Sequence, residues 1–269
     1  MSWNVVTASF YGVKYNRAQR FLDRVCRDAN VRHFANDKSN LFESQFYEDN
    51  KEWFETSPLA TKENKYGAFV WKPQFILEAM DQLEEGDKIL YIDTLDIFHP
   101  DIFKFVDDVM GDDPYLFATA GCRNGNFTKR DCFVYMDCDE EDYWNSSMLE
   151  AGFSFWRVCD QAKKVLKEWQ KYLFDERING DVTDFSGKPQ IDGFIAVRRD
   201  QSVLTNIAIK DGLPVVGYEI REYIECNADY WYERYFTGGV QIYRAIDKFL
   251  VQNIDRVDFL KPEPNFFFF

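Results

Sequence analysis

The sequence contains few histidines, and its cysteines do not form the pairs typical of metal sites. Among 269 residues there are 2 His and 6 Cys. The cysteines stand singly, without a C-x-x-C spacing or the density of a disulfide-rich scaffold. We therefore expect reduced thiols in the core. The cysteines are Cys26, Cys122, Cys132, Cys138, Cys159 and Cys226.

Positive charge is also scarce. Lys and Arg together number 32 against 46 Asp and Glu, which gives a formal net charge of -14. This balance argues against broad electrostatic binding to nucleic acid or to an anionic membrane. We expect that binding of any anionic ligand depends on a few locally placed cations.

Long apolar runs are missing as well. No stretch approaches the roughly 20 apolar residues that span a bilayer, and the start MSWNVVTASF lacks the basic residues and cleavage site of a secretory signal. We therefore expect a soluble, cytoplasmic protein without a membrane span.

The four phenylalanines at 266–269 would favour aggregation if exposed, so they either dock on the core or mark a cut domain boundary.

Aromatic residues, in contrast, are abundant, at 18% of the chain. Most of them must lie in the core. Some Trp and Tyr side chains could line a sugar site, because a flat ring stacks on the apolar face of a sugar. Composition alone does not separate these uses.

Apolar patterns with the period of a strand alternate with patterns that have the period of a helix. We predict strands at 3–10, 88–93, 115–120, 132–136 and 152–158, and helices at 15–30, 72–87, 100–110, 160–174 and 200–210. Such alternation favours an α/β sheet, and the length suits one globular unit. The polar segment 175–193 is rich in Gly and Asp, so we interpret it as a functional loop.

The apolar segment KILYID ends on Asp93, with Asp96 three residues later. Ligands of open α/β sheets bind at the carboxyl ends of the strands, and two carboxylates suit a hard cation such as Mn²⁺ or Mg²⁺. Such a cation would also let an acidic protein receive a diphosphate. Alternatively, Asp93 caps a turn and Asp96 is solvated. His99 could add a third ligand, but a histidine before proline is more often structural or exposed.

Five segments occur in an order that resembles small soluble GT-A glycosyltransferases of bacterial polysaccharide clusters and large DNA viruses. They are VTASFYGVKYNRAQRFL, KYGAFVWKPQFILEAMDQLEEGDKILYID, KRDCFVYMDCD, EAGFSFWR and RRDQSVLTNIAIK, within residues 4–212. The resemblance implies an α/β fold with a Rossmann-like, mixed and mostly parallel sheet flanked by helices, in one GT-A domain over 1–269. It also implies a nucleotide-sugar-binding half over about 1–125 and an acceptor-binding and catalytic half over about 126–269.

The chain departs from that family at its metal motifs. The family has an Asp-x-Asp motif, whereas here Asp93 and Asp96 are separated by Thr94 and Leu95. Either the second ligand is displaced by one residue or Asp93 holds the metal with little help. The carboxyl-terminal His-x-x-Gly-x-x-Lys metal motif of the family is missing.

The segment RRDQSVLTN is similar to the Asp-Gln-Asp-x-Leu-Asn block of retaining galactosyltransferases and glycogenins. It matches at Asp200, Gln201 and Leu204 and differs at Ser202 and Thr205. In that family the block lies beside the anomeric carbon, so the resemblance implies that Asp200 and Gln201 are catalytic, and it slightly favours retention. An alternative role for Asp200 is the N-cap of helix 200–210.

The implied activity is transfer of a monosaccharide from a nucleotide sugar, preferably a UDP-sugar, to a glycan or glycoconjugate, with Mn²⁺ or Mg²⁺ held by Asp93 and Asp96. We expect acceptor binding by Gln190 and Asp192. We expect donor binding by Ala8, Ser9, Tyr11, Tyr15, Trp71, Lys72, Asp93, Thr94, Lys129, Arg130, Asp131, Arg198 and Arg199.

Each of these donor-binding assignments has a structural alternative. Residues 129–131 could be a surface charge cluster, Trp71 and the tyrosines could be core, and the arginines at 198–199 could be loop charges. Two other functions compete with glycosyl transfer. One is a noncatalytic carbohydrate-binding protein, and the other is a metal-dependent phosphohydrolase that uses Asp93 and Asp96.

Overall fold

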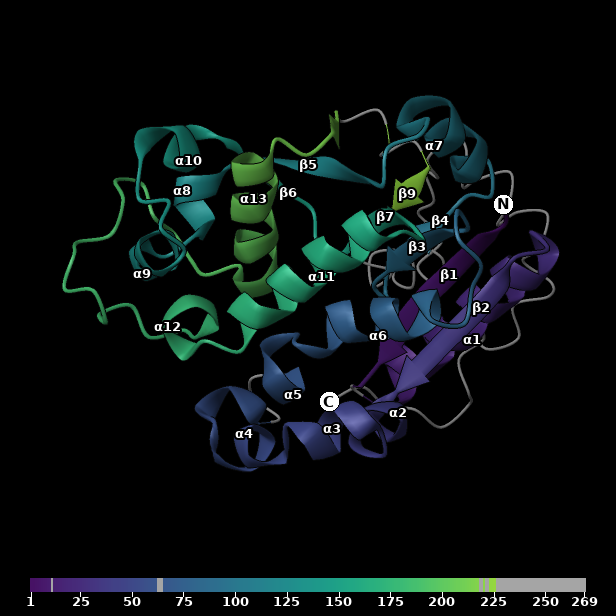
Figure 1. The fold of residues 1–269 in the computed structure, drawn as a ribbon, viewed down its shortest axis with the longest axis horizontal. Coiled ribbons are helices and arrows are strands. Elements are labelled where there is room, and N and C mark those ends of the chain that lie inside the picture. The colour runs from purple at the N-terminus through teal and green to yellow at the C-terminus, as the bar shows by residue number, and fades with distance from the viewer. Residues whose placement is uncertain (11, 62–64, 218–219, 221–222, 226–269) are drawn as a thin grey trace, which may run out of the picture.

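A mixed β-sheet forms the centre of the molecule (Figure 1). The computed structural model describes residues 1–10, 12–61, 65–217, 220 and 223–225. The sheet has seven strands in the order β2-β1-β3-β7-β5-β6, with β8 beside β5. Its strands are β1 (Trp3–Ser9), β2 (Arg32–Asp37), β3 (Lys88–Ile92), β5 (Tyr115–Arg123), β6 (Ser147–Leu149), β7 (Phe153–Arg157) and β8 (Val215–Val216). A separate antiparallel pair joins β4 (Ile97–Phe98) to β9 (Ile224–Glu225).

The strand directions agree with the fold expected from the resemblance. β1 is parallel to β2 and β3, β8 is parallel to β5, and both β3 and β5 are antiparallel to β7. Since β6 is antiparallel to β5, only β6 and β7 oppose the other five strands of the sheet. The prediction of an α/β fold with a mixed, mostly parallel sheet flanked by helices is confirmed.

Helices cover both faces of this sheet. Val5, Leu90 and Ile92 pack into one apolar cluster with α1 and α7, whereas their neighbours Val6 and Tyr91 pack into a second cluster with α6, α11 and α13. This follows from the two-residue period of a strand, which turns successive side chains to opposite faces. The longer helices are α1 (Val13–Asp28), α6 (Trp71–Met80), α7 (Ile102–Met110), α11 (Asp160–Leu173) and α13 (Arg199–Asp211).

Short helices fill the periphery of the molecule, as Figure 1 shows. They are α2 (Lys38–Phe42), α3 (Gln45–Asp49), α4 (Lys51–Thr56), η1 (Pro58–Ala60), α5 (Lys65–Ala68), α8 (Asn124–Phe127), α9 (Arg130–Tyr135), α10 (Glu141–Asn145) and α12 (Glu176–Asn179). Within the described part of the chain, no helix combines the length and the apolar character of a membrane span. The terminal phenylalanines and Cys226 lie outside the described residues.

Two predicted elements differ from the structure. Residues 132–135 lie in α9 and not in a strand, and Met136 is its C-cap. Cys132, Phe133 and Met136 are buried at the i, i+1, i+4 spacing of one helical face. The helix predicted over 72–87 ends at Met80. After it the chain makes a turn that Asp87 fixes by accepting hydrogen bonds from the backbone N–H groups of Ser2 and Glu84.

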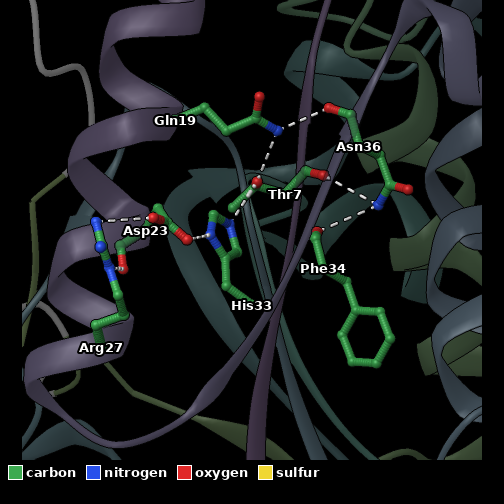
Figure 2. Close-up of polar contacts among 7 residues, drawn as sticks. All are labelled: Thr7, Gln19, Asp23, Arg27, His33, Phe34 and Asn36. Carbon is green, nitrogen blue, oxygen red and sulfur yellow. Dashed lines mark hydrogen bonds and ion pairs between the residues drawn. The ribbon is translucent and has the colours of Figure 1, made fainter.

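A chain of polar side chains joins α1 to β1 and β2 (Figure 2). His33 Nε2 lies 2.9 Å from Thr7 Oγ1, and His33 Nδ1 lies 3.4 Å from Asp23 Oδ1. Gln19 Nε2 donates to Thr7 Oγ1 at 3.1 Å and to the backbone oxygen of Asn36 at 2.7 Å. Burial lowers the pKa of His33, although the hydrogen bond and the charge of Asp23 oppose this shift. We conclude that His33 is neutral near neutral pH.

We expect His33 to make the free energy of unfolding depend on pH. Its pKa in the folded chain lies below the unfolded value of about 6.5, so the unfolded chain binds more protons just below that pH. The contribution is present above pH of about 6.5 and is lost as the pH falls through the folded pKa, by at most about 1.4 kcal/mol per pH unit. Urea unfolding between about pH 5 and 7.5 should show a shallower slope for His33→Gln than for the wild type. Equal slopes would contradict the prediction.

Candidate functional site

Asp93 lies at the carboxyl edge of the sheet, directly after β3. Its backbone N–H donates to Gly152 O at 2.7 Å, which extends the pairing of β3 with the start of β7. Tyr91 Oη donates to Asp93 Oδ1 at 2.7 Å. Burial, together with the charge of Asp93, raises the pKa of Tyr91 well above its usual value, so the phenol remains a donor. The Asp93 side chain is 41% exposed, which leaves it open to a ligand.

The ammonium group of Lys72 joins Asp93 to Asp200. Lys72 Nζ lies 2.7 Å from Asp200 Oδ2 and 3.3 Å from Asp93 Oδ1, and it donates to Ala151 O at 2.8 Å. Burial alone would lower the pKa of Lys72, but the charges of Asp200 and Asp93 outweigh burial and raise it. The group is therefore a buried, charged ammonium between two carboxylates. Two residues that are far apart in sequence, and that were predicted to serve one site, are brought together.

Asp96 lies on the same side of this edge as Asp93. Its backbone N–H donates to Asp93 O at 2.9 Å, and its side chain is buried. A Cβ atom built on Gly152 would lie 3.0 Å from Asp96 Oδ2 and 3.6 Å from Asp93 Oδ2. Both Oδ2 atoms therefore lie beside Gly152, where an added Cβ would be tight against Asp96 and in ordinary contact with Asp93. Thr94, between them in sequence, donates its hydroxyl to Ala8 O at 3.1 Å and ties this turn to the end of β1.

Asp200 is the second residue of α13, and its carboxylate does not cap that helix. The N-cap position is Arg198, and no side-chain capping bond forms there. The Asp200 backbone oxygen accepts a hydrogen bond from Trp169 Nε1 at 3.0 Å, which fixes the first turn against α11. The carboxylate is turned to Lys72 and is almost fully buried. Gln201 follows and is half-buried.

Residues predicted to bind the nucleoside lie near the carboxyl end of β1. Ser9 Oγ donates to Asn16 Oδ1 at 2.7 Å, and Ala8 is buried. Tyr15 is half-buried, and burial raises its pKa. The negative charge of Asp93 raises this pKa further, so Tyr15 lies in the neighbourhood of Asp93. Trp71 is buried against Phe10, with ring centroids 4.6 Å apart. Tyr11 lies outside the described residues.

Residues 129–131 contact the loop that follows α12. Lys129 Nζ donates to Glu176 O at 3.3 Å and to Val182 O at 2.7 Å, and burial lowers the pKa of this lysine. Asp131 accepts from the backbone N–H groups of Phe185 and Ser186. These buried side chains fix the loop, and their predicted roles in donor binding stay predictions.

The remaining predicted residues lie around the same loop. Arg130 pairs with Asp139 at 2.6 Å, and its backbone N–H donates to Gln190 Oε1 at 2.8 Å. Asp192 is exposed, and Arg199 pairs with Asp181.

His99 Nδ1 accepts from the backbone N–H of Asp101 at 3.2 Å, at the start of α7. Nowhere in the described ranges do three His, Cys, Asp or Glu side chains form a group that could hold a metal.

We expect Asp131→Asn to lower the free energy of unfolding by about 1–3 kcal/mol. The amide keeps one acceptor oxygen for the two N–H groups that the carboxylate now serves, and its own N–H donors would be buried without partners. Urea unfolding measures the effect. Asp184→Asn, in an exposed part of the same loop, is the matched control and should change stability by less than about 0.5 kcal/mol. Equal effects of the two variants would contradict the role assigned to Asp131.

Sequence reasoning missed Tyr91 and Gly152. A signal for Tyr91 exists, because residues two apart on a strand face the same side, so Tyr91 shares its side with the residue that ends the strand. The sequence gives no comparable signal for Gly152, whose importance comes from two carboxylates that approach its Cα.

Comparisons with known proteins found similar structures but no sequence relatives. No family model and no curated protein matches the chain. A glycosyltransferase involved in glycosylation of the major capsid of PBCV-1 matches at 13% identity over 72% of this chain and 81% of its own, with a TM-score of 0.38. An active-site mutant of LgtC matches at 14% identity over 79% and 72%, with a TM-score of 0.42. Core-mannan synthase A from Aspergillus fumigatus, in its Mn/GDP form, matches at 9% identity over 81% and 73%, with a TM-score of 0.41.

These structures are glycosyltransferases, the kind of enzyme that the sequence resemblance indicates. At such identities and TM-scores the similarity assigns no substrate, cofactor or residue role to this chain. The roles of its residues therefore depend on its own geometry.

Proposed function

We propose that this chain is a glycosyltransferase that moves a monosaccharide from a nucleotide sugar, preferably a UDP-sugar, to a glycan or glycoconjugate acceptor. The observation that carries the proposal is the ammonium group of Lys72, which lies 2.7 Å from Asp200 and 3.3 Å from Asp93. A metal-binding carboxylate and a catalytic carboxylate of one transfer reaction must act on the same donor. The contact that both Asp93 and Asp200 make with Lys72 supports a shared donor site for the two carboxylates.

Asp93 and Asp96 are the residues that we propose to hold Mn²⁺ or Mg²⁺. Their Oδ2 atoms both lie beside Gly152, and carboxylate oxygens are the ligands that these hard cations prefer. Because no third side chain of the described residues completes a metal group, the diphosphate and water would supply further ligands. When bound, the cation would offset the charge of the leaving diphosphate.

Asp200 is the carboxylate that we propose for the chemical step. In the reaction, the bond between the anomeric carbon and the diphosphate breaks, a bond to the acceptor oxygen forms, and the acceptor hydroxyl loses its proton. The positive charge of Lys72 favours the negative form of this carboxylate, which would accept that proton or stabilise positive charge at the anomeric carbon. The position of Gln201 beside Asp200, and the resemblance of this pair to retaining enzymes, favour retention.

Nucleotide release from a panel of UDP-, GDP- and dTDP-sugars tests the proposal. With Mn²⁺ present we expect release from at least one donor, faster when a glycan acceptor is added, and loss of release when EDTA removes the metal. No release and no binding with any donor would contradict it. Glycan binding that needs neither nucleotide nor Asp93 would favour a noncatalytic carbohydrate-binding protein, and release of phosphate from simple phosphate esters would favour a phosphohydrolase.

A further inference from the structure

Arg123 is a cation that neutral oxygens hold in place at the end of β5. Its Nε donates to Asn145 Oδ1 at 3.1 Å, and its Nη1 donates to Asp192 O at 2.9 Å and to Asn126 Oδ1 at 3.4 Å. These three bonds use the hydrogens on Nε and Nη1. The Nη2 hydrogens have no protein partner among the residues that the structure describes. The guanidinium is thus fixed in position, keeps its full positive charge, and has N–H donors available for a ligand.

Several other cations of this acidic chain have a carboxylate partner. Ion pairs with aspartate are formed by Lys88, Lys104, Arg130, Lys163, Arg177 and Arg199. In the described part of the molecule Arg123 has none, and neither has Arg198, which is exposed and lies 5.2 Å above the ring of Phe127. Because the chain has a formal net charge of -14, binding of an anionic ligand depends on locally placed cations of this kind.

Contacts through α8 connect these two arginines to the segment that leads into α13. The backbone N–H of Arg198 donates to Phe127 O at 2.9 Å, and Asn126, the partner of Arg123, accepts from the backbone N–H of Ile195 at 2.7 Å. Arg198 precedes Asp200 by two residues at the start of α13. Arg198 therefore lies at the end of α13 that carries the proposed catalytic carboxylate, and Arg123 is joined through Asn126 to the segment that leads into this helix.

Cys122 links this region to the other side of the site. Burial raises the pKa of its thiol, the charge of Arg198 lowers it, and the charge of Glu150 raises it. The next residue after Glu150 is Ala151, whose backbone oxygen accepts a hydrogen bond from Lys72 Nζ. Arg198 therefore lies in the neighbourhood of Cys122, the residue before Arg123.

We propose that Arg123 and Arg198 form a subsite for an anionic group, a carboxylate or a phosphate, on the acceptor. This inference rests on the proposed function, and it names the acceptor class as an acidic or phosphorylated glycan. Guanidinium groups bind carboxylate and phosphate by charge-assisted hydrogen bonds, which are about twice as strong as neutral ones. The diphosphate of the donor has the same chemistry, so the test must separate the two sources.

Paired acceptors that differ in one charge test the subsite. Glucuronate is compared with glucose, galacturonate with galactose, and glucose 6-phosphate with glucose, each at a fixed donor concentration. In the wild type we expect the anionic member of a pair to have a KM at least tenfold lower. Arg123→Gln should raise that KM at least tenfold, with a much smaller effect on the KM of the neutral sugar or of the donor. Arg20→Gln, which removes a charge from the exposed surface of α1, is the matched control and should change none of them.

Other outcomes would overturn the inference. Equal KM values within each pair, or a rise in the donor KM alone in Arg123→Gln and Arg198→Gln, would assign the arginines to the donor or to no ligand. If no donor is turned over, the proposed function fails, and calorimetric binding of glucuronate against glucose still tests the subsite. Binding of glucuronate that is selective and lost in Arg123→Gln would support the subsite, whereas equal or absent binding of both sugars would contradict it.

Discussion

Replacement of Lys72 by methionine should lower the free energy of unfolding by about 3–5 kcal/mol and abolish nucleotide release. The side chain is fully buried, and its ammonium lies 2.7 Å from Asp200. Methionine replaces the apolar stem of the lysine but lacks its ammonium, and it leaves the buried Asp200 carboxylate without a cation. Most of the destabilisation should arise at Asp200, because the Asp93 side chain is 41% exposed and remains partly solvated. Urea unfolding and nucleotide release measure the two effects.

Lys163→Met is the matched control for this variant. Lys163 also lies 2.7 Å from a carboxylate oxygen, that of Asp81, but the Asp81 side chain is 70% exposed. An exposed ion pair contributes about 0–1 kcal/mol, so the control should lose little stability and no activity. If both variants lost the same stability, or if Lys72→Met kept full activity, the central position of Lys72 would be disproved.

Asp200→Asn should reduce the rate of monosaccharide transfer to an acceptor by a factor of about 10²–10⁴, with a smaller effect on stability. The amide has nearly the same shape as the carboxylate and still offers an oxygen to Lys72. It cannot take up a proton from the acceptor hydroxyl, and it offers no negative charge to the anomeric carbon. The loss should therefore fall mainly on kcat, measured under saturating donor and acceptor.

Asp181→Asn controls for the loss of one negative charge near the start of α13. Asp181 pairs with Arg199, next to Asp200 in sequence, but its side chain is 63% exposed. We expect this variant to keep kcat within a factor of about 3. Wild-type kcat in Asp200→Asn would remove Asp200 from the chemical step.

The sequence was sufficient to place Asp93. An apolar run that ends on a carboxylate marks the carboxyl end of a buried strand, and in an α/β fold that end is where ligands bind. The alternative, a solvated Asp96, is wrong, because that side chain is buried over Gly152. The prediction that Asp93 follows a buried strand is confirmed, because strand period depends on local residues, whereas its role as a metal ligand stays a prediction.

Contacts between distant segments were not predictable in the same way. Lys72 and Asp200 are 128 residues apart, and only the packing of α6 and α13 on one face of the sheet brings them together. The strand predicted at 132–136 failed because a short run of apolar residues does not distinguish a strand from a helical turn. The edge strand β2 was missed because it is half exposed and has a weak apolar pattern. The division into halves at about residue 125 stays a prediction.

The melting temperature with a nucleotide sugar and Mn²⁺, compared in the wild type and in Asp93→Asn, tests most directly whether these carboxylates form one donor site. A ligand that binds only the folded chain stabilises it by about 2.7 kcal/mol at a hundred times its Kd. We predict a rise of several degrees in the wild type, with Mn²⁺ required, and its loss in Asp93→Asn but not in Asp108→Asn on the exposed surface of α7. The account would be contradicted if the melting temperature rose equally in Asp93→Asn and Asp108→Asn. It would also be contradicted if no UDP-, GDP- or dTDP-sugar raised the melting temperature of the wild type.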